Sequence, residues 1–309
     1  MTTQTPSTSS AAKPAKASAF KRYADRNRQS QGGKTIRGKR LVIRYIVLVL
    51  VLILLLGPLV VPLLAAFKAP GEPVFGQGAT VFPQTWSLKA FHDLFAKTHI
   101  VGSIGNSLIV CALTVVSQLI LSSLGGYMLS RRGWKGRGIA QAIVMSAMIF
   151  PFESLMLSLF NIVANVHLYG SLIGVWLPAM IGPFQILLMR AAFMGIPDEI
   201  EDAAFIDGAG EARRFFTIFL PQVKGALTVV GLTAFIFAWS DFLWPLLVLP
   251  DPNNQTMMLA LTTLKSSVEG VTYQQILAGA IVALIPVLLI FFFTQKYFFR
   301  GIEDGGLKF

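Results

Sequence analysis

The stretch Pro197–Pro221 reads PDEIEDAAFIDGAGEARRFFTIFLP and is the most polar region between two long apolar runs. It carries six of the chain's 15 acidic residues: Asp198, Glu199, Glu201, Asp202, Asp207 and Glu211. Pro197 suits a first helical turn, and Asp198 with Glu201 has the spacing of a capping box. The pattern therefore predicts that a helix begins here.

The second half of this stretch predicts a turn and another helix. Asp207-Gly208 is typical of a tight turn, because glycine tolerates positive φ. From Glu211 to Leu220 a helical pattern resumes, with three aromatic residues on its apolar side: Phe215, Phe216 and Phe219. We therefore expect two short helices joined by a turn, lying outside the membrane between two spans.

The composition is that of a protein that crosses a membrane several times. Mean hydropathy is +0.65, and apolar residues make up 54% of the chain whereas charged residues make up 13%. The net charge of +11 does not indicate a nucleic-acid partner, because ten Lys/Arg fall within residues 1–40 and most others border apolar runs. The single cysteine excludes an intrachain disulfide, and the three histidines do not cluster into a metal site.

Six apolar runs are long enough to cross a bilayer, which takes about 20 residues of helix. They cover residues 41–67, 103–130, 139–163, 172–193, 226–249 and 276–299. The fold class predicted is thus an all-α polytopic membrane protein with six transmembrane helices. We expect four regions: a disordered basic tail (1–36), the first span with an external loop (37–100), a core (101–299) and a short C-terminal tail (300–309).

The distribution of basic residues predicts that both termini lie in the cytoplasm. With the N-terminus inside, the inner segments are the N-terminal tail, residues 131–138, residues 190–225 and the C-terminal tail. These segments hold 22 of the 26 Lys/Arg, as the positive-inside rule requires. The Pro197–Pro221 stretch is then cytoplasmic.

The Pro197–Pro221 stretch resembles the EAA loop of binding-protein-dependent ABC importer permeases. The family pattern is Glu-Ala-Ala, three residues, Gly, nine residues and Ile-x-Leu-Pro. Its spacing is matched by Asp202, Ala203, Ala204, Gly208, Ile218, Leu220 and Pro221. There are two departures: Asp202 is one methylene shorter than the usual glutamate, and Gly225 stands where many members carry a further proline. Neither departure undermines the resemblance.

The resemblance extends over most of residues 100–309. Further matching segments are Asn106–Val110, Tyr127–Arg131, Pro151–Glu153, Phe237–Phe242 and Arg300–Lys308. Two positions depart from the family, since Ser240 replaces the Asn of a Trp-Asn-Asp-Phe segment and Phe309 replaces a small residue. The six spans and the C-terminal tail imply the MalG-like half of a carbohydrate importer, with the MetI-like permease fold.

The resemblance implies a transport subunit in the cell membrane of a bacterium or archaeon. It would form half of a pathway beside a second, MalF-like permease, with two copies of a cytoplasmic ABC ATPase and an extracytoplasmic sugar-binding protein. ATP and Mg²⁺ would bind in the ATPase, whereas this chain has no Walker A pattern, carries no cofactor and is not expected to be an enzyme. The residues implied to couple to the ATPase are Glu201, Asp202, Ala203, Ala204, Asp207, Gly208 and Pro221.

Two kinds of contact with the ATPase are expected from the loop. Asp202, with Glu201 beside it, would pair with basic residues of the ATPase. An exposed pair is worth only about 0–1 kcal/mol. We therefore expect apolar contact through Phe215 or Phe219 to contribute more of the affinity.

Four residues are candidates for the substrate path: Glu153, Asn106, Trp239 and Asp241. Glu153 is an ionisable group in a predicted span, about 21 Å along it from Ile139 at 1.5 Å per residue. Its carboxylate could accept hydrogen bonds from sugar hydroxyls, or it could be protonated or bond helix groups loosened by Pro151, and both readings stay open. Trp239 suits a membrane anchor, and Asp241 could bind a helix terminus, the partner permease or a binding protein.

Three other functions are compatible with parts of the sequence. An ABC importer of a non-sugar solute is the nearest, since the EAA pattern is shared more widely. A secondary transporter should show several intramembrane charges and internal repeats, but only Glu153 is clearly intramembrane and no repeat is visible. A membrane enzyme would need a clustered nucleophile and base, or metal ligands, and the sequence shows neither.

Overall fold

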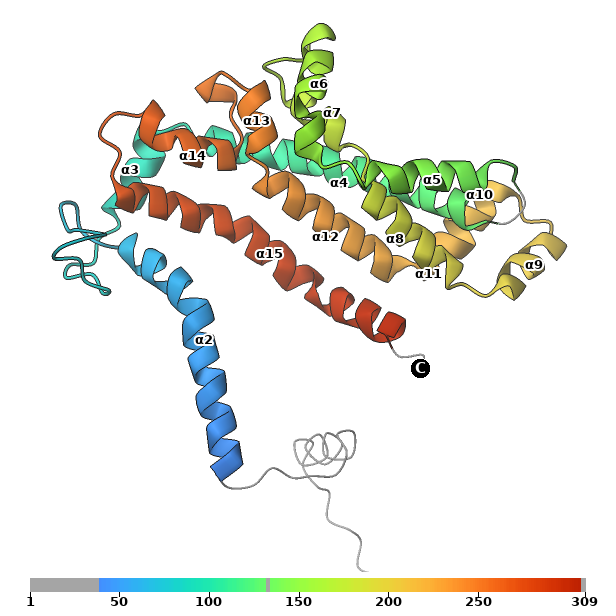
Figure 1. The fold of residues 1–309 in the computed structure, drawn as a ribbon, viewed down its shortest axis with the longest axis horizontal. Helices are drawn as coiled ribbons and strands as arrows, with labels where there is room; N and C mark the ends of the chain where they lie inside the picture. Colours follow the sequence, from blue (N-terminus) through green and yellow to red (C-terminus); the bar gives the residue numbers. More distant parts are fainter. Residues whose placement is uncertain (1–38, 132–133, 307–309) are drawn as a thin grey trace, which may run out of the picture. The chain divides into compact units, whose positions relative to one another are not determined.

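The computed structural model describes residues 39–131 and 134–306 (Figure 1). Within these ranges the chain is helical, with one isolated β-bridge between Lys68 and Trp86 and no named strand. The chain forms two compact units, residues 1–59 and 60–309. The tail predicted for residues 1–36 lies outside the described residues.

The described part of the first unit belongs to helix α2 (Lys39–Ala65). Its apolar side chains are exposed on every face, and the stretch Val42–Ala65 is long and apolar enough to cross a membrane. A helix that is apolar all round needs lipid or protein around it rather than water. The first predicted span is therefore present as a helix.

Helix α4 (Ile100–Ser130) is the centre of the second unit. It packs against α8 (Pro183–Met194) and α12 (Lys224–Ser240), and α12 packs against α15 (Tyr273–Gly306) (Figure 1). Gly126 permits the closest of these approaches, since a Cβ added there would lie 2.5 Å from the Met189 Cβ. Small residues at such contacts are what lets helix backbones approach in membranes.

Three described helices are long and apolar enough to cross a membrane, and the number reaches six if each of three bent pairs is one span. The pairs are Arg137–Ala147 with Phe152–Asn165, Leu172–Ala179 with Pro183–Met194, and Glu211–Gln222 with Lys224–Ser240. They bend by 99°, 44° and 80° respectively. The six spans predicted from composition thus have counterparts in the described chain, but half of them are broken.

The predicted third span is wrong as a continuous helix. Helices α5 (Arg137–Ala147) and α6 (Phe152–Asn165) meet at 99°, with Pro151 at the N-cap of α6. Proline lacks an N–H and disfavours helix in the residue before it. Glu153 consequently lies exposed in the first turn of α6 rather than far along a straight helix from Ile139.

Other boundaries differ from those expected. The predicted fifth span ends early, because α12 stops at Ser240 and α13 (Leu243–Val248) is a separate helix. Helix α15 continues through the expected C-terminal tail to Gly306. The remaining elements are α3 (Lys89–Lys97), α7 (Leu172–Ala179), η2 (Pro252–Asn254) and α14 (Met257–Ser267).

The loop between α2 and α3 is organised around a buried lysine. Lys68 Nζ donates to the carbonyl oxygens of Pro73 and Thr80, at 2.8 and 2.7 Å, and lies 3.8 Å from the Glu72 carboxylate. The Gln84 N–H donates to Glu72 Oε1 at 3.0 Å. This backbone hydrogen bond, and secondarily the Lys68 charge, hold the pKa of Glu72 below its ordinary value.

Candidate functional site

The helix–turn–helix predicted for Pro197–Pro221 is present. Helix α9 (Asp198–Ile206) is followed by a turn in which Gly208 has a φ of +69°. No atom lies within 4 Å of a Cβ added at Gly208, so the backbone conformation alone calls for glycine. The capping-box prediction was wrong: the N-cap is Pro197, which places Asp198 inside the helix.

The second helix of the loop contains an unexpected π-helical segment. Helix α10 (Glu211–Arg213) leads into the π-helix η1 (Arg214–Phe219), and α11 (Leu220–Gln222) follows with Pro221 in its first turn. Such segments are rare and are frequent at functional sites.

The π-helix turns two of its three phenylalanines into the protein. Phe215 and Phe219 are buried, and their rings pack against Tyr127 at centroid distances of 5.1 and 5.4 Å. Phe216 is 63% exposed instead. The expectation that Phe215 or Phe219 contacts an ATPase was therefore wrong, because both anchor the loop to the helical core.

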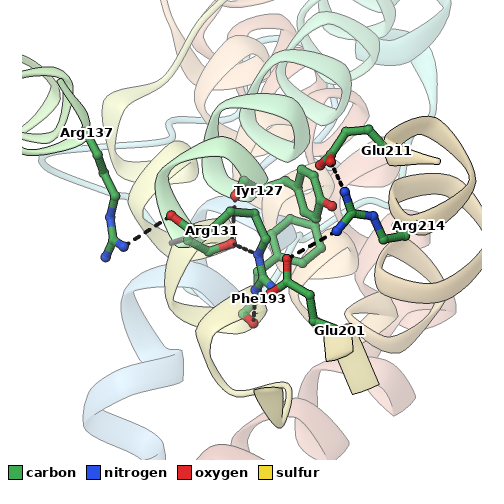
Figure 2. Close-up of polar contacts among 8 residues, drawn as sticks. Tyr127, Arg131, Arg137, Phe193, Glu201, Glu211 and Arg214 are labelled. Atoms are coloured by element: carbon green, nitrogen blue, oxygen red, sulfur yellow. Dashed lines mark hydrogen bonds and ion pairs between the residues drawn. The ribbon is translucent and has the colours of Figure 1, made fainter. Parts of the chain in front are cut away.

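A guanidinium group at the end of α4 holds the loop from inside (Figure 2). Arg131 Nη1 donates to Glu201 Oε2 at 2.7 Å, and Nη2 donates to the Phe193 carbonyl oxygen at 3.0 Å. The guanidinium carbon lies 4.4 Å from the centre of the Phe219 ring. Arg131 thus contacts α4, α8, α9 and η1 at once.

A second arginine lies on the other side of Glu201. Arg214 Nη1 is 3.7 Å from Glu201 Oε1, and Nη2 donates to Glu211 Oε2. Its guanidinium carbon lies 3.9 Å from the centre of the Phe205 ring. Two arginines and two glutamates therefore form one network, which Figure 2 shows together with Tyr127.

The predicted coupling residues divide between two faces of α9. Glu201 is 19% exposed and is paired with two arginines of its own chain, so its expected pairing with an ATPase stays a prediction. Ala204 is buried, whereas Asp202 and Ala203 are exposed. The largest exposed side chains of α9 are Phe205, 61% exposed, and Ile206, 87% exposed. Neither was predicted from the sequence to be a coupling residue. Both residues directly precede the Asp207-Gly208 turn, and this position could have indicated that they are exposed.

The candidate substrate-path residues have partners within the chain, apart from the exposed Glu153. Asn106 Nδ2 donates to the Gln255 carbonyl oxygen at 3.1 Å. Trp239 is buried and donates from Nε1 to the Ala283 carbonyl oxygen at 3.0 Å, so it is a core residue rather than a membrane anchor. Asp241 accepts from the Trp244 N–H at 3.4 Å at the start of α13, which fits the helix-terminus alternative. Within residues 39–131 and 134–306, no group of three metal-ligating side chains forms.

Comparison with known proteins identifies what the chain is similar to. Residues 118–304 match the family described as binding-protein-dependent transport system inner membrane component. The arabinooligosaccharides transport system permease protein AraQ of Halalkalibacterium halodurans is 34% identical over 254 residues, covering 81% of this chain and 90% of that protein. The maltodextrin transport system permease protein MdxG of Bacillus subtilis is 30% identical over 277 residues, covering 89% and 98%.

A solved structure confirms the fold class. The crystal structure of a bacterial ABC transporter involved in the import of the acidic polysaccharide alginate aligns with a TM-score of 0.77. The alignment covers 86% of this chain and 100% of that chain, at 21% sequence identity. The predicted all-α importer-permease fold is therefore present.

Proposed function

Because the chain belongs to the family of binding-protein-dependent transport system inner membrane components, we propose that it is the MalG-like permease of a sugar importer, driven by a separate ATPase that docks on α9. Relatives that are named for the transport of arabinooligosaccharides and maltodextrin support a sugar as the substrate. Their alignments cover most of both chains. The alternative is an importer of another solute, because the family is defined by its mode of transport rather than by its substrate.

The exposed tip of α9 is the observation that carries the coupling proposal. Asp202 and Ile206 are four residues apart and share one face of the helix, and both are exposed. Fully burying an isoleucine contributes about 1.5–3 kcal/mol, whereas an exposed ion pair contributes about 0–1 kcal/mol. The partner surface that fits is an apolar cleft with basic residues at its rim.

The remaining partners follow from this assignment. A second permease completes the pathway, two ATPase copies bind ATP and Mg²⁺, and an extracytoplasmic binding protein delivers the solute. This chain does not hydrolyse ATP. The excess of Lys/Arg in the segments flanking the spans supports cytoplasmic termini.

The test is uptake by the reconstituted complex. The chain is assembled in proteoliposomes with the second permease and ATPase encoded beside it, together with its binding protein. Uptake of labelled arabino- and malto-oligosaccharides is compared with that of glycerol phosphate. We expect ATP-dependent sugar uptake that survives an uncoupler, whereas uptake that stops with the proton gradient would indicate a secondary transporter.

The role of the α9 tip is tested by Ile206→Asp. We expect ATPase co-purification and uptake to fall by at least about tenfold, because the variant places a carboxylate in an apolar contact. Phe82→Asp is the matched control, since Phe82 is 67% exposed in the loop on the proposed outer side. Normal ATPase binding by Ile206→Asp would contradict docking at this tip.

A further inference from the structure

We propose that Arg131 is a positioning residue that fastens α9 to the membrane core, so that movement of α9 by the ATPase is transmitted into α4 and α8. The proposal rests on the proposed function of α9 and goes beyond it. The movement would be transmitted by the ion pair of Arg131 with Glu201 inside this chain, which we call the ionic joint, rather than by the surface that the ATPase contacts.

The guanidinium of Arg131 has a partner for each of its three nitrogens. Nε donates to Ser130 Oγ at 3.0 Å, Nη1 to Glu201 and Nη2 to the Phe193 carbonyl oxygen. The side chain is 11% exposed, and its flat face lies over the Phe219 ring. The planar fork of arginine makes all of these contacts at once, and a lysine ammonium does not.

Glu201 is the residue of α9 to which Arg131 binds. It is 19% exposed and lies on the inward side of the helix with the buried Ala204, whereas Asp202 and Ile206 are exposed. Its two oxygens take different partners, Oε2 from Arg131 and Oε1 from Arg214. Glu201 therefore connects α9 both to the end of α4 and to the π-helix.

The ionic joint is the main tie because α9 packs little against other helices. The extensive helix contacts of this unit join α4, α8, α12 and α15, and α9 is not among them. Two apolar side chains of α9 lie on its inward side: Ala204 is buried, and the half-buried Ile200 packs against the cluster that contains Phe215 and Phe219. We therefore expect a push on the outward face of α9 to reach α4 and α8 through Glu201 and Arg131, and we expect removal of that joint to leave the exposed residues Asp202 and Ile206 available to the ATPase.

The experiment compares ATPase binding with the number of sugar molecules taken up per ATP hydrolysed. The variants are Arg131→Ala, Arg131→Lys and Glu201→Gln in the full reconstituted complex. Lys135→Ala is the matched control, since Lys135 is an exposed basic residue of the same loop. We expect Arg131→Ala to keep the ATPase bound and hydrolysing while uptake per ATP falls by roughly tenfold, the loss expected for a charge-assisted hydrogen bond.

Two further results separate a joint from a merely structural residue. Arg131→Lys should recover part of the lost coupling, because it restores the charge without the fork. The loss in the double variant Arg131→Ala with Glu201→Gln should be smaller than the sum of the two single losses, because the two residues share one contact. Where Arg131→Ala fails to assemble, Glu201→Gln provides the same test with a side chain of the same shape.

The outcomes distinguish this proposal from the proposed function. Normal ATPase binding by Ile206→Asp would overturn docking at α9, whatever Arg131 does. If docking holds, release of the ATPase by Arg131→Ala would overturn the joint, as would unchanged uptake per ATP in both Arg131→Ala and Glu201→Gln. Additive losses in the double variant would overturn it as well.

Discussion

Gly208 is the residue on which the shape of the α9 loop depends most directly. Its φ of +69° is in the left-handed region, and its Cβ position is open. A β-branched residue there would meet no neighbour, so any effect of substitution comes from the backbone, at about 1–3 kcal/mol. A substitution at Gly208 therefore tests the loop conformation without a clash at the Cβ position.

We expect Gly208→Val to lose ATPase co-purification and sugar uptake while the permease stays in the membrane. Gly208→Asn is the control, because asparagine tolerates positive φ far better than valine. Both activities are measured relative to the permease in the membrane. Full retention by the valine variant would mean that the loop conformation does not matter for coupling.

Glu72 makes the loop between α2 and α3 sensitive to acid. Its pKa is lowered, first by the Gln84 N–H and then by Lys68. A group whose folded pKa is lowered stabilises the fold above its ordinary pKa, and this contribution is lost as pH falls through the lowered value. We expect the protection of residues 68–86 against hydrogen exchange, relative to the intrinsic exchange rate at each pH, to decrease below about pH 4. Glu72→Gln should show little such decrease, and an equal decrease in both proteins would assign it to other groups.

At the scale of elements, the contact between α4 and α8 is a close helix approach in the second unit. A Cβ at Gly126 would lie 2.5 Å from the Met189 Cβ and 2.7 Å from the Arg190 backbone nitrogen. At Gly125 the nearest atom is 3.4 Å away, in the Ile186 side chain. An added Cβ at Gly126 would therefore clash with α8, whereas one at Gly125 would make an ordinary contact.

We expect Gly126→Ala to lower the thermal stability of the purified permease, because overpacking costs about 1–3 kcal/mol. Gly125→Ala should change it little, since Ile186 can adjust. The measurement is the melting temperature of both variants in the same detergent. Equal melting temperatures would contradict the close packing of α4 on α8.

Local features of these elements could be predicted from the sequence, and distant ones could not. The turn at Gly208 was predicted from the backbone freedom of one residue, whereas the break at Pro151 was missed, because the apolar run 139–163 was read as one span although proline lacks an N–H. The 99° bend after α5 depends on packing that no local pattern contains. The pairing of Arg131 with Glu201 joins residues 70 positions apart. From the sequence alone, Glu201 was therefore taken for a surface acid. The π-helix that buries Phe219 has no recognisable sequence pattern.

At the scale of the whole molecule, we propose that this chain forms only half of a sugar pathway. A groove of about 800 Å³ in the described residues is open and is lined mostly by apolar side chains of α4, η1, α12 and α15. Such a surface offers few groups that can hydrogen-bond sugar hydroxyls. We expect the purified chain with its ATPase to be inactive until the second permease is added, and sugar transport by a homodimer would contradict this.

The central claim is that the tip of α9 faces the ATPase on the cytoplasmic side. The most direct measurement places a photo-crosslinking amino acid at Ile206 in the assembled transporter, and at Phe82 in a second sample. We expect a crosslink to the ATPase from position 206 and none from position 82. A crosslink from position 82, or its absence at 206 in a complex that transports sugar, would contradict it.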